Sequence, residues 1–437
     1  MKLSVIGCGY LGAVHAASMA ELGHDVVGID VDANKIDVLN AGKAPFFEPG
    51  LQPILERGLE SGRLRFSTDS SAAADATVHF IGVGTPQKKG EHAADLQYVE
   101  AAVEGLLPHL SPGDVVVGKS TVPAGTADRL LARIQEVQPA ATLVWNPEFL
   151  REGYAVKDTI SPDRLVYGLP SGPQRDHARQ VLDRVYARAL EQGTPLVATD
   201  FITAELVKVA ANAFLATKIS FINAMSEISG ALGGNITELA DAIGYDARIG
   251  RRFLNAGIGF GGGCLPKDIR AFRARAEELG LGDSLAFLKE VDAINLRQRE
   301  RVVELVERAL GDDVVGKKVT VLGLAFKPES DDIRDSPALD VAVRLKGLGA
   351  DVAVTDPQAI DNAYSRYPQL NYVASTGKAL KDAEVVVLLT EWQEYRELNP
   401  HVVGELTAGK TIIDGRNVLD PERWRGAEWT YVGLGRP

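Results

Sequence analysis

A glycine-rich run that ends in a cysteine carries the strongest chemical signal in the chain. Five glycines occupy the seven positions from Gly257 to Gly263, and so many glycines favour no regular structure because each loses much backbone entropy on folding. The pattern indicates that another group approaches this backbone closely. Cys264 follows, with Lys267 and Asp268 after it. Backbone N–H groups and a cation beside a thiol favour the thiolate, so we predict that Cys264 is a nucleophile and not a buried, inert cysteine.

A lysine and an asparagine interrupt a strongly apolar stretch. Lys208 and Asn212 are four residues apart within a segment of helical periodicity, Thr203–Ala231, so both project from one face of the expected helix. Such a pair is often just part of a solvated face. Because the neighbouring residues are apolar, we expect both side chains to face a polar site, where they could stabilise a developing oxyanion.

A second glycine pattern, GCGYLG, begins at Gly7 directly after a β-branched run and precedes an amphipathic stretch. Gly7 permits a tight turn, Gly9 allows a pyrophosphate to approach the backbone, and Gly12 allows close packing of helix on strand. Asp30 ends the next expected strand, where a carboxylate accepts hydrogen bonds from the adenosine ribose and repels a 2′-phosphate. The pattern predicts a site for NAD rather than NADP. Cys8, inside the loop, is expected only to fill space.

Two loops at the ends of expected strands add polar groups, Ser120–Thr126 and Asn146–Gly153. Ligands of open α/β sheets bind beyond the carboxyl ends of the strands, where both loops would lie. The same residue types also occur in ordinary turns and helix caps, so each loop alone is weak support for a site.

These residues need a scaffold of alternating strands and helices. In the first part of the chain we expect strands at Leu3–Ile6, Asp25–Ile29, Thr77–Val83, Asp114–Lys119 and Thr142–Trp145, with a helix at Ala13–Leu22 after the glycine loop. After the long central helix we expect strands at Lys318–Leu322, Asp351–Thr355, Glu384–Leu389 and Thr411–Ile413, with a helix at Pro337–Leu348. The pattern predicts an α/β fold: two doubly wound Rossmann-like domains joined by a central helical dimerisation region.

The central helix sets the domain boundaries. Its apolar residues lie on more than one face, which one neighbouring domain cannot cover, so we expect a homodimer or a higher homo-oligomer. The expected domains are 1–200 (NAD binding), 201–310 (helical dimerisation, with the cysteine loop) and 311–437 (Rossmann-like), with a glycine-bounded joint at 311–317. In the third domain Val321–Lys327 lacks the later glycines of the first loop, so a cation reaching a phosphate is expected there and not a second dinucleotide.

The charge and cysteine content of the chain argue against several classes of partner and site. The 437 residues carry 47 Lys plus Arg and 59 Asp plus Glu, a net charge of −12, which disfavours nucleic acid and anionic membranes as partners. Only two cysteines are present and no His-Glu-x-x-His motif occurs, so we expect no disulfide framework and no metal site. The low cysteine content also favours a reducing cytoplasm. The short apolar runs and the absence of a signal-peptide pattern lead us to expect a soluble, unprocessed protein.

Taken together, the motifs resemble those of the UDP-glucose/GDP-mannose dehydrogenase family, in the same order along essentially the whole chain. The segments that carry the resemblance are Gly7–Gly12, Gly84–Pro86, Ser120–Thr126, Asn146–Gly153, Lys208 with Asn212, Gly259–Asp268, Ala325–Lys327 and Asp414–Asn417. The resemblance implies an NAD-dependent four-electron oxidation of a sugar-nucleotide C6 alcohol to a carboxylate, as in nucleotide-sugar metabolism and polysaccharide biosynthesis. A second hydride leaves an aldehyde carbon readily only after a nucleophile has made it tetrahedral, which is the need that a thiol meets.

The resemblance also implies roles for particular residues. Cys264 would form a thiohemiacetal and then a thioester, Lys208 and Asn212 would stabilise oxyanions, and Asp268, Thr121 and Glu152 would serve proton transfer and thioester hydrolysis. The implied NAD contacts are Gly7, Gly9, Tyr10, Leu11, Gly12, Asp30, Lys35, Thr85, Thr121, Glu152, Lys267 and Arg334. The implied substrate contacts are Glu148, Phe149, Leu150, Lys208, Asn212, Arg248, Phe253, Gly261, Phe326, Lys327 and Arg416. Arg248 resembles the arginine that reaches the neighbouring subunit's site.

Several alternatives remain open at this point. The tract Gly244–Leu254 resembles the branch that oxidises UDP-glucose to UDP-glucuronate more than the GDP-mannose branch, and Lys267 argues against the branch for UDP-N-acetylhexosamines. A two-electron dehydrogenase of the hydroxyacid type would share a lysine and asparagine pair but leave Cys264 idle. A nucleotide-sugar sensor without turnover is a third, non-enzymatic possibility, which the nucleophile disfavours.

Overall fold

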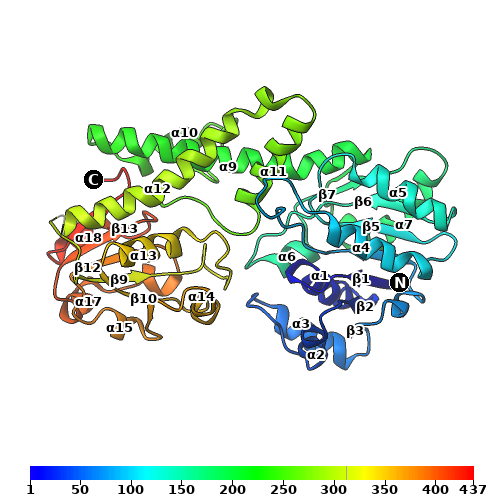
Figure 1. Cartoon of the computed structure of the whole chain (residues 1–437), viewed down its shortest axis with the longest axis horizontal. Helices are drawn as coiled ribbons and strands as arrows, with labels where there is room; N and C mark the ends of the chain where they lie inside the picture. Colours follow the sequence, from blue (N-terminus) through cyan, green and yellow to red (C-terminus); the bar gives the residue numbers. More distant parts are fainter. Residues whose placement is uncertain (312) are drawn as a thin grey trace. The chain divides into compact units, whose positions relative to one another are not determined.

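A computed structural model describes residues 1–311 and 313–437 of the chain. The chain divides into two compact units, Met1–Ala211 and Asn212–Pro437, each of which contains one sheet. The first lies at the blue end and the second at the red end of the chain in Figure 1. The joint expected at 311–317 includes Asp312, which is outside the described residues.

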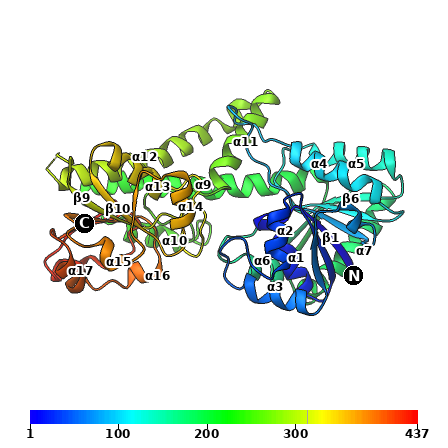
Figure 2. The same ribbon diagram turned by 60° about the horizontal axis from the view of Figure 1, so that its bottom comes forward.

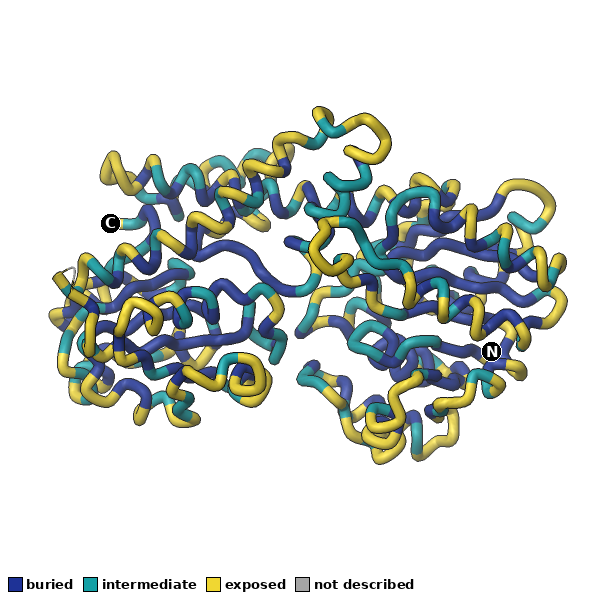
Figure 3. Tube along the Cα trace, in the orientation of Figure 1, coloured by how far each residue is buried: buried dark blue, intermediate teal, exposed yellow. Residues whose placement is uncertain are grey.

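The first unit is built on an eight-stranded sheet in the order β3-β2-β1-β4-β5-β6-β7-β8. Its strands are β1 (Lys2–Ile6), β2 (Asp25–Ile29), β3 (Leu64–Ser67), β4 (Val78–Ile81), β5 (Val115–Gly118), β6 (Thr142–Trp145), β7 (Leu165–Gly168) and β8 (Leu196–Thr199). The strands β1 to β6 are parallel, and β7 joins β6 in the antiparallel sense. The central strands are buried along their length (Figure 3), as expected for a parallel sheet covered on both faces.

Helices cover both faces of this sheet (Figure 2). The helices of this unit are α1 (Tyr10–Glu21), α2 (Ala33–Asn40), α3 (Leu51–Glu60), α4 (Gln97–Leu106), α5 (Thr126–Val137), α6 (Ala155–Ile160), α7 (Gln174–Val185) and α8 (Ala187–Glu191), with short 3-10 turns η1 (Ser70–Ala73) and η2 (Leu107–His109). One hydrophobic cluster joins α1, α3, α6 and α7 to the sheet, and a second joins α4, α5 and the start of α9 to the opposite face. The doubly wound arrangement predicted from the sequence is confirmed.

The second unit contains a six-stranded parallel sheet in the order β11-β10-β9-β12-β13-β14. Its strands are β9 (Lys318–Leu322), β10 (Asp351–Thr355), β11 (Asn371–Tyr372), β12 (Val385–Leu388), β13 (Thr411–Asp414) and β14 (Thr430–Gly433). Its helices are α10 (Ile236–Gly244), α11 (Leu265–Glu278), α12 (Phe287–Ala309), α13 (Pro337–Gly347), α14 (Ile360–Arg366), α15 (Thr376–Ala379), α16 (Gln393–Arg396), α17 (Pro400–Leu406) and α18 (Pro421–Gly426), with a 3-10 turn η3 (Gly282–Leu285). Numbered within its own unit, this strand order is 3-2-1-4-5-6, the order of a dinucleotide-binding fold.

The predicted strands lie where they were expected, four of them with the predicted bounds and the others within two residues at either end. The sequence did not predict the outer strands β3, β7, β8, β11 and β14. Strands β3, β8, β11 and β14 each contain exposed residues, so their apolar runs are weak, whereas β7 is buried but only four residues long. The helix expected at Ala13–Leu22 is wrong at its start: α1 begins at Tyr10, so that Gly12 lies within its first turn.

The long helix α9 (Phe201–Leu232) was predicted as Thr203–Ala231. Within the second unit it packs against α12, where the Ser220 hydroxyl donates to the Val291 carbonyl oxygen at 2.7 Å. Six large apolar side chains of α9 remain exposed: Ile202, Leu206, Phe214, Phe221, Ile228 and Leu232. Among the residues that the structure describes, no helix combines the length and apolarity needed to cross a bilayer.

Candidate active site

The first glycine loop forms a tight turn between β1 and α1. Gly7 has a φ of +89°, which glycine adopts without strain. A side chain at Gly12 would collide with the carbonyl oxygen of Gly7, so helix and strand can pack this closely only with glycine there. A Cβ at Gly9, by contrast, would meet no atom within 4 Å. The backbone N–H groups at the start of α1 are therefore accessible to a ligand at Gly9, as a bound pyrophosphate requires.

Asp30 lies at the end of β2 beside this loop. Its carboxylate accepts hydrogen bonds from the backbone N–H of Cys8 at 2.7 Å and from the ammonium group of Lys35 at 2.8 Å. Burial acts to raise the pKa of Asp30, but these hydrogen bonds outweigh it and the pKa is lowered. An ionised carboxylate with Lys35 beside it suits ribose hydroxyls. Cys8 is fully buried, as expected for a residue that fills space.

A buried glutamate that the sequence did not point to joins the glycine loop to the loop before α6. Glu48 accepts hydrogen bonds from the Tyr10 hydroxyl and from the backbone N–H groups of Gly153 and Ala155, both at 2.7 Å. Burial and the hydrogen bond to Glu48 raise the pKa of Tyr10, which keeps the hydroxyl protonated. Two residues expected to contact NAD are half-buried here, Leu11 in the first turn of α1 and Glu152 beside Gly153.

The second polar loop approaches α9. The Lys208 ammonium donates to the Glu148 carboxylate at 2.9 Å and lies 5.7 Å from the centre of the Phe149 ring. The other Glu148 oxygen accepts from the Leu150 backbone N–H at 2.6 Å. Only 6% of the Lys208 side chain is exposed. The structure thus brings Lys208 together with the three expected substrate contacts of this loop.

The loop that carries Thr121 is held by the carboxylate of Glu205, a residue of α9. Glu205 is buried and accepts from the backbone N–H groups of Gly125 and Ala127, both at 2.7 Å, at the start of α5. Burial raises the pKa of Glu205 to about 7 even though these N–H groups act to lower it. Thr85 donates to the backbone carbonyl oxygen of Thr121 at 2.8 Å. Glu205 gave no signal in the sequence, because a single glutamate on a helix is ordinarily solvated.

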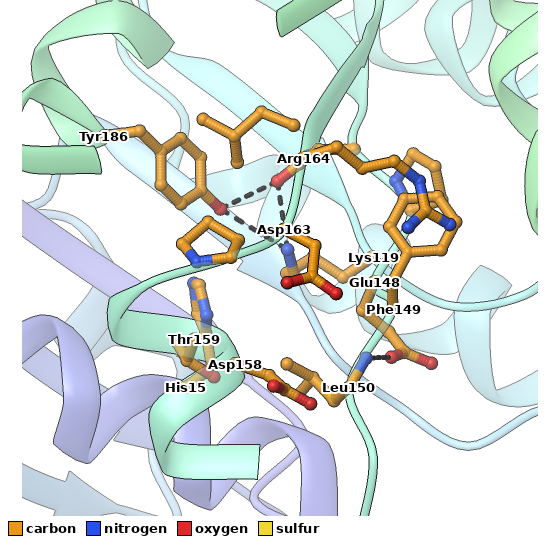
Figure 4. Close-up of a pocket in the computed structure, with 14 residues that line it drawn as sticks. His15, Lys119, Glu148, Phe149, Leu150, Asp158, Thr159, Asp163, Arg164 and Tyr186 are labelled. Carbon is orange, nitrogen blue, oxygen red and sulfur yellow. Dashed lines mark hydrogen bonds between the residues drawn. The ribbon is translucent and has the colours of Figure 1, made fainter. Parts of the chain in front are cut away.

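Glu148, Lys119, Asn146 and Tyr186 are among the residues that line a small cavity of about 50 Å³. Lys119, at the end of β5, is buried there and donates to the Asn146 side-chain oxygen at 3.0 Å and to the Tyr186 hydroxyl at 3.3 Å. Figure 4 shows Lys119 and Tyr186 converging, with Arg164 stacked over Phe149. Within the described residues no carboxylate forms an ion pair with Lys119. Burial lowers the pKa of Lys119 to about 8, which leaves the amine close to titration near neutral pH.

Replacing Lys119 by methionine is expected to stabilise the protein at pH 7. The pKa of Lys119 is about 8 in the folded protein instead of 10.5, so the unfolded chain binds the proton more tightly. Burying the charged ammonium group therefore lowers the free energy of unfolding. This destabilisation is fully present below pH 8 and disappears as the pH rises towards 10.5. We expect the free energy of unfolding to increase by about 1–3 kcal/mol at pH 7 after the lost hydrogen bonds are counted, and by much less at pH 10. Urea denaturation at both pH values measures this.

The control for that comparison is Lys346→Met, an exposed position on α13, for which the unfolding free energy should be nearly unchanged at both pH values. A Lys119→Met protein that is destabilised equally at pH 7 and pH 10 would mean that the hydrogen bonds of Lys119 outweigh the burial of its charge.

In the second unit Cys264 is the residue that precedes α11, and it is exposed. The positive end of a helix dipole lies at this terminus, which favours a thiolate. Asp268, one turn into the helix, is buried and accepts from the Asn212 amide at 2.7 Å and from the Lys267 ammonium at 2.7 Å. Four residues predicted to act together therefore lie around one helix terminus.

The glycine run before Cys264 is approached closely by the chain's own residues 326–335. A Cβ at Gly262 would lie 2.8 Å from the Phe326 ring, and side chains at Gly261 or Gly263 would collide with the Asp335 carbonyl oxygen or the Arg334 guanidinium group. Arg334 also pairs with Asp332 at 2.7 Å. The close approach predicted from the glycines is confirmed, and the approaching group is protein.

Arg416 is anchored among the loops of the second unit. Its guanidinium group donates to the carbonyl oxygens of Leu389, Gly259 and Phe326 at 2.8, 3.0 and 3.0 Å. Lys327 lies 5.5 Å from the ring of Phe326. The arrangement ties the cysteine loop to the two loops at the carboxyl ends of β9 and β12.

Asp356 is the counterpart of Asp30 in the second sheet, and the sequence did not point to it. It is buried and accepts from the backbone N–H groups of Leu324 and Ala325 at 2.7 and 3.0 Å and from the Trp392 indole at 3.1 Å. Its carboxylate therefore fixes the loop after β9 to the end of β10.

Two expected substrate contacts have exposed side chains. Arg248 is 89% exposed and pairs with Asp246 at 2.6 Å. Phe253 is exposed and has a φ of +65°, which is unusual for a non-glycine residue. That Arg248 reaches a neighbouring subunit stays a prediction.

Known proteins resemble the chain over its whole length. Models of the UDP-glucose/GDP-mannose dehydrogenase family match in three parts: the NAD binding domain over residues 1–190, the central domain over 202–297 and the UDP binding domain over 320–421. The UDP-glucose 6-dehydrogenase of Rhizobium meliloti (strain 1021) is 41% identical over 441 residues, covering 100% of both chains. The UDP-glucose 6-dehydrogenase TuaD of Bacillus subtilis (strain 168) is 40% identical, covering 100% of this chain and 93% of its own.

Solved structures show the same likeness. A UDP-glucose dehydrogenase from Pyrobaculum islandicum is 40% identical, with a TM-score of 0.89 over 100% of this chain and 98% of its own. A UDP-D-ManNAc dehydrogenase from Pyrococcus horikoshii has a TM-score of 0.85 over 100% and 99% of the two chains, at 26% identity.

Proposed function

Because the chain belongs to the UDP-glucose/GDP-mannose dehydrogenase family, we propose that it oxidises UDP-glucose to UDP-glucuronate at C6 with two molecules of NAD. The observation that carries the proposal is the position of Cys264 at the N-terminus of α11, with Asp268 held one turn away. Relatives named UDP-glucose 6-dehydrogenases are about 40% identical, whereas the neighbour named for an N-acetylated sugar is 26% identical. The difference supports glucose as the sugar.

The first domain would hold NAD, and bound NAD would supply the hydride acceptor for both oxidations at C6. We propose that Gly7, Gly9, Tyr10, Leu11, Gly12, Asp30, Lys35, Thr85, Thr121, Glu152, Lys267 and Arg334 contact it. After the first oxidation the C6 aldehyde is attacked by the Cys264 sulfur, and the carbonyl oxygen takes up a proton to give a thiohemiacetal. Loss of a second hydride and that proton gives a thioester. Water then breaks the C–S bond and yields the carboxylate and the thiol.

The neighbouring groups support these steps. Lys208 and Asn212 carry N–H donors one turn apart on α9, so both can stabilise negative charge on the C6 oxygen. Asp268 is held by Asn212 and Lys267 and can take up the alcohol proton. Thr121 with an ordered water would share that proton transfer, and Glu152 would assist attack of water on the thioester.

The substrate contacts are proposed by the same reasoning. Lys208, Asn212, Glu148, Phe149 and Leu150 would contact the sugar and the adjoining phosphate. Phe253, Gly261, Phe326, Lys327 and Arg416 would contact the nucleotide part, with Lys327 as the cation nearest a phosphate. The proposed domains are an NAD-binding Rossmann domain (1–200), a central helical dimerisation domain with the cysteine loop (201–310) and a Rossmann-like domain that binds the UDP-sugar (311–437).

We also propose a homodimer formed through α9. Its exposed Phe214 and Leu232 side chains, 66% and 81% exposed, would be covered by a second copy, and Arg248 would reach the partner's site. Two cysteines in 437 residues fit a reducing compartment, so we assign the protein to the cytoplasm.

The stoichiometry of NADH tests the proposal. With purified protein and limiting UDP-glucose we expect two NADH and one UDP-glucuronate per sugar, and little turnover of GDP-mannose, UDP-N-acetylglucosamine or UDP-N-acetylmannosamine. Absorbance at 340 nm and chromatography of the nucleotide sugars give both numbers. One NADH with an aldehyde product would point to a two-electron dehydrogenase, and no NADH with any nucleotide sugar would point to a sensor.

A further inference from the structure

A buried asparagine on α12 pairs with the backbone of the cysteine loop. Asn295 is 0% exposed. Its side-chain oxygen accepts the Phe260 N–H at 2.7 Å, and its side-chain nitrogen donates to the Phe260 carbonyl oxygen at 2.9 Å. The Asn295 amide therefore pairs with both the backbone N–H and the backbone carbonyl oxygen of Phe260, as a residue of a neighbouring antiparallel strand would.

Phe260 is the point at which the glycine run is attached to the helices. Its ring is buried in a cluster with Ile269 of α11 and Leu288 and Val291 of α12. A side chain at Gly259 would collide with the Asn295 amide oxygen. Between Phe260 and Cys264 lie only three glycines, which offer no side chains to hold the backbone in place.

We propose that Asn295 is a positioning residue for Cys264. By fixing Phe260 it sets where the three glycines enter α11, and so keeps the thiol against the N–H groups at the start of that helix. This inference rests on the proposed function for its catalytic consequence, but the effect on the thiol can be measured without turnover.

The variant that tests this is Asn295→Asp. It keeps the acceptor for the Phe260 N–H but replaces the donor by a carboxylate oxygen that faces the Phe260 carbonyl oxygen. We expect three changes relative to the unmodified protein. Hydrogen exchange should be faster in peptides that cover residues 257–265. Alkylation of Cys264 by iodoacetamide should be about threefold or more slower because the thiolate is less favoured, and kcat should be about 10–100-fold lower. The KM for NAD should stay within about twofold, since the glycine loop of the first unit is untouched.

Alkylation of the folded protein should be specific for Cys264, because Cys8 should not react. It is the only other cysteine, and burial raises the pKa of its thiol to about 12, so it should remain unlabelled in the folded protein. Mass spectrometry of the labelled peptides verifies this.

The matched control is Asn223→Asp on α9. Asn223 is also 0% exposed, and its side-chain oxygen accepts the Gly257 N–H at 2.9 Å. Its side-chain nitrogen has no hydrogen-bond partner among residues 1–311 and 313–437. This variant therefore also buries a carboxylate but loses no hydrogen bond, and we expect a smaller effect on alkylation and kcat.

Each outcome decides the proposal. Slower alkylation and lower kcat in Asn295→Asp, beyond those of the control and after correction for the folded fraction, support it. Unchanged alkylation, or equal effects in the two variants, would overturn it. If the unmodified protein does not oxidise UDP-glucose, the proposed function fails, while the exchange and alkylation measurements still decide the role of Asn295.

Discussion

Replacing Cys264 by alanine is expected to abolish formation of the sugar acid, lowering the rate of UDP-glucuronate production by about 10⁴-fold or more. Without the sulfur the aldehyde carbon stays trigonal and has no covalent route to a second hydride loss. The residue is exposed at the start of α11, so its removal leaves no cavity in a core. Chromatographic quantification of the acid measures the loss.

Binding of the nucleotide sugar should survive this substitution, because none of its proposed contacts is removed. Calorimetric titration with UDP-glucose checks it. Cys8→Ala serves as the control, since Cys8 is buried beside the glycine loop and is assigned no chemistry. Normal glucuronate formation by Cys264→Ala would exclude the covalent route.

Replacing Lys208 by methionine is expected to lower kcat by about 10²–10³-fold. The substitution keeps the length of the side chain but removes the cation that faces Glu148 at 2.9 Å. Any oxyanion at C6 would then lose a donor, and Glu148 would be left as a half-buried carboxylate without this partner. Initial rates at saturating NAD and UDP-glucose measure the effect.

The KM for NAD should change little in Lys208→Met, because Asp30 and Lys35 hold their positions at the end of β2 independently. Lys346→Met, exposed on α13, controls for loss of a positive charge and should retain full activity. Equal losses of kcat in the two variants would show that Lys208 acts only through net charge.

The residues that sequence reasoning identified have signals that are local. Gly7, Gly9 and Gly12 follow one strand and begin one helix, and the five glycines before Cys264 stand within seven positions. Such patterns arise because a tight turn or a close approach restricts consecutive residues directly. The fold class followed similarly from apolar periodicity, which reports burial of one face of each element.

Only the tertiary structure decided which groups hold those residues in place. Glu48, Glu205, Asn295 and Asp356 are single polar residues without a motif, and each accepts backbone N–H groups from distant segments of its own unit. The need for such residues arises when a loop is buried, because an unpaired N–H group in the interior costs more than the hydrogen bond contributes. That requirement fixes a position in space and leaves no periodic trace along the chain, so the sequence determined the chemistry while the packing within each unit decided which residues support it.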